Sequence, residues 1–338
     1  MRDCALGKGA HIVIMTMLDP DLRTAMRRRN LAHTWLLAAG SVALLLACAF
    51  LIAGPIGVVW AGFGGVFSLV VAWNVSPKMV LRLYAARPLP AHAFPEGHRI
   101  VAELAARAGL ARPPTLWYVP SRMMNAFAVG RNEEAVICVT DGLIRGLTLR
   151  EFTAVIAHEL AHVAADDLKV MALADVTNRM TGILSMLGLV FLFLNLPAIL
   201  AGDLGQVPVF GILLLLVAPT LGGLMQLALS RTREYDADLS AVQLTGDPEG
   251  LAAALLKLER IQGRLWEALA LPHGRIPNPS LLRTHPDTNE RVRRILALAG
   301  STRHTRFDGD DRPPTVGRSI IPVTGAPRYR ARGLGHWY

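Results

Sequence analysis

Residues 31–77 have the sequence LAHTWLLAAGSVALLLACAFLIAGPIGVVWAGFGGVFSLVVAWNVSP, which contains no Lys, Arg, Asp or Glu. Within it, Thr34 to Ala53 and Ile56 to Val75 are each about 20 residues long, the length that a helix needs to cross a hydrocarbon core of about 30 Å. Gly54 and Pro55 lie between them and are typical of a tight turn. The stretch therefore predicts a transmembrane hairpin, and two buried core helices are the alternative.

A second pair of apolar stretches lies farther along the chain. Residues 181–202 and 204–230 contain no charged side chain, and only Asp203 separates them. They predict a second hairpin. Here Asn195 and Pro197 weaken the pattern, so that two buried core helices are a stronger alternative than for the first hairpin.

The composition of the chain agrees with membrane insertion. Hydrophobic residues make up 52% of the 338 residues and charged residues 18%, whereas soluble domains carry about 25% charged residues. Such a chain is too apolar to be intrinsically disordered. Its three cysteines form no C-x-x-C pair, which excludes a disulfide framework and a cysteine-rich zinc ribbon.

The net charge of +9 is typical of proteins that meet nucleic acid or a membrane surface, or whose charges orient membrane spans. Residues 1–33 carry +3 and residues 301–338 carry +4, and the hairpin tips have no Lys or Arg. By the positive-inside rule we expect a multi-pass membrane protein with both termini and the middle segment cytoplasmic. Aromatic residues are sparse in the basic tail, so we expect no nucleic-acid partner.

The segment between the hairpins has the character of a soluble domain. Its hydrophobic period favours a helix over residues 97–110, and β-type runs follow at 115–119, 124–130 and 135–140. A further helix begins at Thr148, because Thr148-Leu-Arg-Glu151 is a capping box. The fold class that this predicts is mainly α with a small β-sheet and two transmembrane helical hairpins.

The domain boundaries follow from these elements. Asp247-Pro248 and Pro286 open two further helices after the second hairpin, and the tail has no periodicity. In chain order we predict a basic N-terminal extension (1–33), hairpin 1 (34–77), the first part of the cytoplasmic domain (78–180), hairpin 2 (181–230), its second part (231–300) and a flexible basic tail (301–338).

The strongest chemical signal is His158-Glu159-Leu160-Ala161-His162, on the helix that begins at Thr148. The i, i+4 spacing puts both imidazoles on one helix face about one turn apart, so that one zinc ion can take a nitrogen from each. Glu159 can reach a water on that metal and take its proton. The motif in a helical context favours a metal site over a chance match.

A catalytic zinc needs a third protein ligand and an open position for water. The segment Ser230-Arg-Thr-Arg-Glu-Tyr-Asp-Ala-Asp238 offers Glu234 and Asp238 on one helix face. One carboxylate can bind zinc while the other accepts a hydrogen bond from a ligand imidazole. The alternative is a solvated acidic face interleaved with Arg231 and Arg233.

Over about residues 34–299, this order of segments resembles the HtpX-type membrane zinc metalloproteases, relatives of the CAAX prenyl endopeptidases. Several motifs in the same order are far more specific than H-E-x-x-H alone. Besides the two motifs above, the matching residues are Asn125-Ala-Phe-Ala-Val-Gly130, Val136 to Thr140 with Gly142-Leu143, Asp167, and Thr284-His285-Pro286-Asp287 with Glu290-Arg291.

The resemblance implies a gluzincin-like zinc protease domain that binds one zinc ion per chain. The implied zinc ligands are His158, His162 and Glu234. Glu159 is the implied general base, and Asp238 and Asp167 are implied to support the ligands from behind.

The resemblance also implies how a substrate is held. Asn125, Ala126 and Phe127 would lie in the substrate cleft, near an edge strand that pairs with an extended peptide. His285 would lie near the zinc and steady the oxyanion. A turn asparagine and a helix N-cap are the structural alternatives for Asn125 and His285.

The function that the resemblance implies is a zinc endopeptidase of the cell inner (plasma) membrane that acts on misfolded or membrane proteins in quality control under stress. An intramembrane protease is disfavoured, because Glu151, Asp166 and Lys169 beside the motif would be costly to bury. A prenyl-protein endopeptidase shares the motifs but has more spans than the four found here. A non-enzymatic membrane scaffold or metal sensor would not need Glu159.

Overall fold

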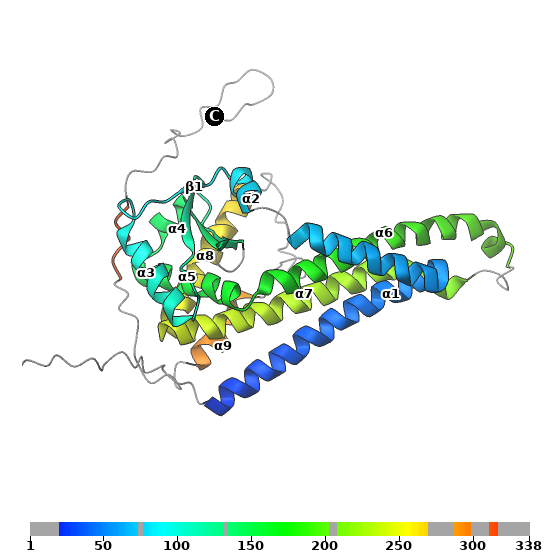
Figure 1. Cartoon of the computed structure of the whole chain (residues 1–338), viewed down its shortest axis with the longest axis horizontal. Helices are drawn as coiled ribbons and strands as arrows, with labels where there is room; N and C mark the ends of the chain where they lie inside the picture. The colour runs from blue at the N-terminus through cyan, green and yellow to red at the C-terminus, as the bar shows by residue number, and fades with distance from the viewer. Residues whose placement is uncertain are drawn as a thin grey trace, which may run out of the picture.

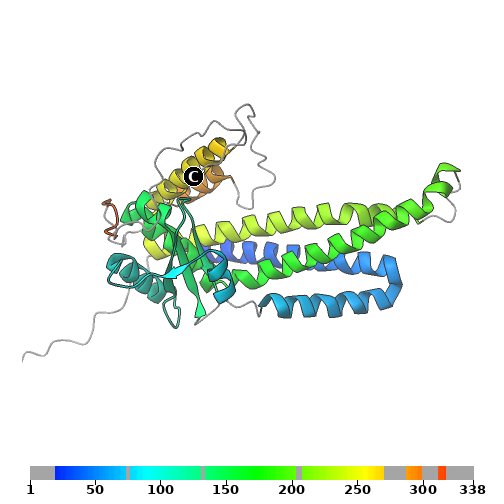
Figure 2. The ribbon, with the colours of Figure 1, turned by 90° about the horizontal axis from the view of Figure 1, so that it is seen from above.

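The protein is described by a computed structural model that covers residues 20–73, 77–130, 134–202, 208–269, 287–298 and 311–316. A globular part joins a long helical bundle that extends from one side of it (Figures 1 and 2). The elements are α1 (Pro20–Trp73), α2 (Pro77–Leu83), β1 (Arg87–Pro88), α3 (Pro95–Arg107), β2 (Thr115–Val119), β3 (Ala126–Val129), β4 (Val136–Thr140), α4 (Asp141–Gly146), α5 (Leu149–Ala164), α6 (Asp167–Leu200), α7 (Val209–Thr245), α8 (Pro248–Leu269) and α9 (Thr288–Ala297).

Helix α1 bends back on itself at the turn that the sequence predicts. Ala53 and Gly54 have non-helical backbone angles, and the φ of Gly54 is 57°, a conformation that glycine adopts without steric cost. Beyond this bend, the second half of α1 returns toward the globular part (Figure 2). The apolar part of α1, Asn30–Val71, therefore forms two arms rather than one straight span.

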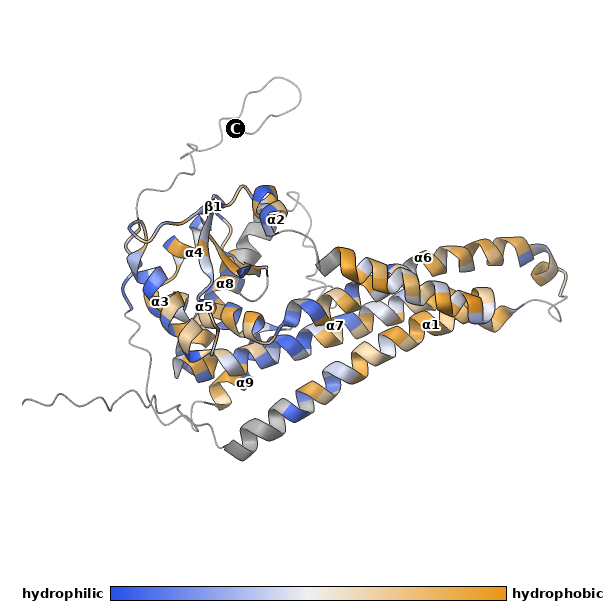
Figure 3. Cartoon of the chain, in the orientation of Figure 1, coloured by the Kyte–Doolittle hydropathy of each residue, from blue (hydrophilic) through white to orange (hydrophobic). Residues whose placement is uncertain are grey.

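Helices α6 and α7 form the second pair of the bundle. The stretches Lys169–Leu200 of α6 and Val209–Thr245 of α7 are long and apolar enough to cross a membrane, as is the apolar part of α1. Many of their apolar side chains are exposed: Phe193 is 64% exposed and Phe210 is 77% exposed, and Figure 3 shows hydrophobic residues along the bundle. Burial inside a protein core, the alternative reading of these segments, is therefore wrong, and the surface is the kind that lipid covers.

Both helices of the second pair continue beyond the predicted spans. Helix α6 begins at Asp167 and α7 runs on to Thr245, so each enters the globular part. The two helices thereby carry polar residues from the bundle directly to the H-E-x-x-H helix.

The globular part contains a four-stranded sheet with the order β1-β2-β4-β3. Strands β2 and β4 are parallel, and β3 pairs antiparallel with β4 at the edge of the described sheet. Every residue of β4 is buried, as expected for a central strand covered on both faces. The sheet confirms the small β-structure expected from the three β-type runs.

Helix α5 packs into the core through one face. Phe152, Ile156 and Leu160 are fully buried at i, i+4 spacing, and Phe94 meets Phe152 edge-on with ring centroids 5.2 Å apart. The predicted capping box is present at its start: the Glu151 backbone N–H donates to Thr148 Oγ1, and the Thr148 N–H donates to the Glu151 carboxylate at 2.8 Å. The start of α5 and its buried face together fix the direction in which the face that carries His158 and His162 points.

The C-terminal elements differ in detail from the sequence-based expectation. Helix α9 begins at Thr288 with Asp287 as its cap, two residues later than predicted, and Pro286 lies outside the described residues. The described part of the expected tail, residues 311–316, contacts the globular part: Arg312 pairs with Glu96, and its carbonyl accepts the Leu149 N–H. For the rest of residues 301–338 the flexible tail stays a prediction.

Candidate metal centre

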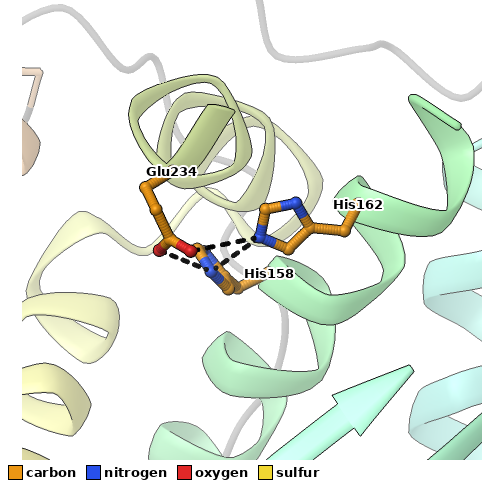
Figure 4. Close-up of side chains that lie close together, drawn as sticks. All are labelled: His158, His162 and Glu234. Carbon is orange, nitrogen blue, oxygen red and sulfur yellow. Dashed lines mark hydrogen bonds and ion pairs between the residues drawn. The ribbon is translucent and has the colours of Figure 1, made fainter. Parts of the chain in front are cut away.

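Three side chains converge where α5 meets α7. His158 and His162 come from α5 and Glu234 from α7, and they point toward one another (Figure 4). The two Nε2 atoms are 3.2 Å apart, and the Glu234 oxygens lie 3.4 Å from His158 Nε2 and 3.8 Å from His162 Nε2. One donor atom from each residue therefore lies within 4.8 Å of the others.

This spacing fits a tetrahedral metal ion. Metal–nitrogen bonds of about 2.0–2.1 Å at tetrahedral angles put ligand atoms about 3.3 Å apart. Two imidazole nitrogens and a carboxylate are also a donor set that zinc accepts in catalytic sites. The three residues thus have the chemistry and the separation to hold one ion, while their role as ligands stays a prediction.

Each histidine has a carboxylate close to its other ring nitrogen. His162 Nδ1 makes a hydrogen bond of 2.7 Å with Asp167 Oδ2. His158 Nδ1 lies 3.1 Å from Asp238 Oδ1, a charge contact that is not aligned as a hydrogen bond. With Nδ1–H facing a carboxylate, each Nε2 keeps its lone pair for a metal. The arrangement is the one that orients metal-binding imidazoles.

A buried arginine anchors each of these carboxylates. Arg291 donates from Nε and Nη2 to both oxygens of Asp238, at 2.7 and 2.6 Å. Arg233 donates from Nε to Asp167 Oδ1 at 2.5 Å. Both arginines are less than a tenth exposed. Their positive charges offset carboxylate charges that would otherwise be costly to bury.

The local charges favour a cation at the histidines. Burial opposes protonation of His158, but Asp238 and Glu234 outweigh it and raise its pKa to about 10. Burial also opposes ionisation of Asp238, yet Arg291 and His158 hold its pKa below the usual range. The carboxylates that favour a proton on the imidazole would likewise stabilise a divalent metal ion there.

Glu234 and Asp238 are not the solvated acidic face that was the alternative for this motif. Glu234 is 6% exposed and Asp238 is 3% exposed. Glu234 faces both Nε2 atoms, whereas Asp238 stands behind His158. The solvated alternative is therefore wrong, and the structure separates the two carboxylates that the spacing alone left equivalent.

The remaining predicted residues lie around this centre or outside the described residues. Glu159 is partly exposed on α5. Burial lowers the pKa of Arg291, but the nearby carboxylates raise it more: Asp238 and Glu234 have the larger effects, and Glu159 adds a smaller one. Asn125 is exposed just before β3, where its backbone N–H donates to Thr140 Oγ1 at 2.9 Å. Ala126 and Phe127 begin β3, which packs beside α5. His285 lies outside the described residues.

Two residues of the centre escaped the sequence analysis. Arg233 entered it only as part of a solvated face, and Arg291 only as a match to a motif. The signal was available for both, because basic residues beside several acidic ones near a metal motif are candidates for buried ion pairs.

The chain is similar to known proteins over most of its length. The family model "Peptidase family M48" matches residues 91–299. Protease HtpX of Legionella pneumophila (strain Philadelphia 1) is 38% identical over 285 residues, covering 80% of this chain and 99% of that protein. A Protease HtpX homolog of Burkholderia ambifaria is 36% identical over 296 residues, covering 82% and 99%. The crystal structure of S. mikatae Ste24p aligns with a TM-score of 0.44 and 19% identity, over 80% of this chain and 66% of that one.

Proposed function

Because the chain belongs to peptidase family M48 and is related to HtpX proteases over most of its length, we propose that it is an integral-membrane, zinc-dependent endopeptidase. The observation that carries this proposal is the convergence of His158, His162 and Glu234 with a carboxylate behind each histidine. A merely structural cluster has no need to keep both Nε2 atoms directed at one point.

In the proposed mechanism, His158, His162 and Glu234 would hold the zinc ion. Bound zinc would supply Lewis acidity to the scissile carbonyl and to the attacking water. Glu159 accepts the proton of that water and passes it to the leaving amine nitrogen. Asp167 and Asp238 keep the imidazoles in the orientation that leaves Nε2 free to bind.

Strand β3 is the proposed substrate-binding edge. It is the last strand of the described sheet and packs beside α5, so an extended peptide paired to it would run past the metal centre. Main-chain pairing suits a protease that accepts many sequences. Asn125, Ala126 and Phe127 would contact that peptide, and His285 would donate to the oxyanion.

We further propose the inner membrane as the location, with the metal centre and both termini on the cytoplasmic side and the domain boundaries given above. The basic residues that flank the apolar segments support this orientation. Misfolded or membrane proteins are the proposed substrates, since a site next to the bundle can reach chains that leave the bilayer.

The metal assignment is tested by His162→Ala in the full chain, purified in detergent. We expect metal content to fall from about one zinc per chain to near zero, and casein cleavage to be lost with it. His98→Ala is the matched control, because His98 Nε2 donates a hydrogen bond to the Leu89 carbonyl at 2.8 Å, away from the centre. Equal zinc in His162→Ala and wild type would contradict the site.

The orientation is tested by fusing a reporter at Asp203, between α6 and α7. We expect a reporter that is active only in the cytoplasm to be silent there, because the tip of the second hairpin would lie across the membrane. A fusion after residue 316 is the control and should be active. A signal at Asp203 as strong as that of the control would reverse the proposed topology.

A further inference from the structure

A continuous chain of polar contacts leads from α1 to His162. Asn30 Nδ2 donates to Asp236 Oδ1 at 2.5 Å, and the other oxygen of Asp236 accepts from Arg233 Nη1 at 3.1 Å. Arg233 Nε donates to Asp167 Oδ1 at 2.5 Å, and Asp167 Oδ2 lies 2.7 Å from His162 Nδ1. Each carboxylate in the chain uses one oxygen toward each neighbour.

From this geometry we infer that Asn30 is a positioning residue of the metal centre, acting on His162 through Asp236, Arg233 and Asp167. The inference rests on the proposed zinc site and adds to it a contribution from the first membrane helix. Asn30 stands at the start of the apolar part of α1 and is 206 positions from Asp236 in the chain. The first hairpin would then help to build the centre in addition to anchoring the chain.

The guanidinium of Arg233 is the element that transmits the restraint. Arg233 is 8% exposed, and its guanidinium lies between two carboxylates, Asp236 and Asp167. Its donors are fixed in one plane, so a shift of Asp236 tilts the group and moves the hydrogen bonds to Asp167. The amide of Asn30 limits that shift, because it occupies the Asp236 oxygen that faces α1.

The bundle offers a matched contact without this connection. Asn178 Nδ2 of α6 donates to Gln226 Oε1 of α7 at 3.1 Å. It is also an asparagine that joins two helices of the bundle, but among the described residues no hydrogen bond or ion pair links this pair to His158, His162 or Glu234. Removing it should loosen the bundle without altering the metal centre.

The test measures zinc affinity of the full chain in detergent, by competition with a chelating dye, and the melting temperature of the zinc-free protein. Loss of a residue that supports a metal ligand commonly weakens binding by about 10–100-fold. We expect Asn30→Ala to raise the Kd for zinc by about 10-fold, and Asn30→Gln, which keeps an amide donor, to recover part of the loss. Asn178→Ala should lower the melting temperature and leave the Kd within about twofold.

A double-mutant cycle decides whether Asn30 acts through Arg233. In the Arg233→Lys background, which already lacks the planar fork, Asn30→Ala should change the Kd by less than about twofold. An unchanged Kd in Asn30→Ala, or a full loss that persists in the Arg233→Lys background, would overturn the inference. If His162→Ala retained its zinc, the proposed metal site itself would be wrong. If His162→Ala lost its zinc while Asn30→Ala bound zinc as tightly as wild type, only the inference about Asn30 would be wrong.

Discussion

Glu159→Gln is expected to lower kcat for casein cleavage by about 10²–10⁴-fold while leaving zinc content unchanged. Glutamine has the shape of glutamate but cannot take a proton from the attacking water. Glu159 lies next to His158 on α5 and is partly exposed, so it is accessible to water. It is not one of the three converging donors, so its replacement should not release the metal.

The measurement compares kcat and zinc per chain for the variant and wild type under the same detergent conditions. Glu103→Gln is the control: Glu103 lies on α3 and pairs with Arg107 at 2.7 Å, and removing it should change kcat by less than about twofold. Equal cleavage by Glu159→Gln and wild type, with equal zinc, would exclude Glu159 as the general base.

Arg291→Met is expected to destabilise the protein by about 3–5 kcal/mol, because it leaves buried carboxylates without their cation. Asp238 receives two hydrogen bonds from Arg291, and Glu234 Oε2 lies 3.1 Å from its Nη1. Methionine preserves much of the side-chain volume, so lost charge rather than lost packing dominates. The loss should be seen as a lower melting temperature in the zinc-free protein, and it should be smaller with zinc bound, since the ion replaces part of the missing charge.

Arg293→Met on the same helix is the matched control. Arg293 is exposed and pairs with Glu290, and exposed pairs contribute about 0–1 kcal/mol. A melting temperature of Arg291→Met no lower than that of Arg293→Met would show that Arg291 does not hold the centre together.

Much of the fold follows from short stretches of the chain. The absence of charge over residues 31–77 and 181–230, apart from Asp203, is enough to predict four apolar arms, because their length matches a bilayer. The capping box at Thr148 likewise predicts where α5 begins. The helices nonetheless extend farther than hydropathy indicated: α6 begins at Asp167, since a helix does not have to end where a membrane does.

The candidate site was predictable to the extent that it lies within one helix. Spacing i, i+4 alone directs His158 and His162 to one face of α5, because the helical period is a local property. By itself, therefore, the sequence determined the apolar arms and the pair of imidazoles.

Only the tertiary structure decided which carboxylate faces those imidazoles. Glu234 and Asp238 lie one turn apart on the same face of α7, so the sequence does not distinguish them. Their roles depend on how α7 is rotated against α5. That rotation is set by packing between segments far apart in the chain. The same holds for Arg291 on α9 and for Asn30 on α1. Their positions became visible only once the helices were assembled, because ion pairs between elements have no periodicity in the sequence.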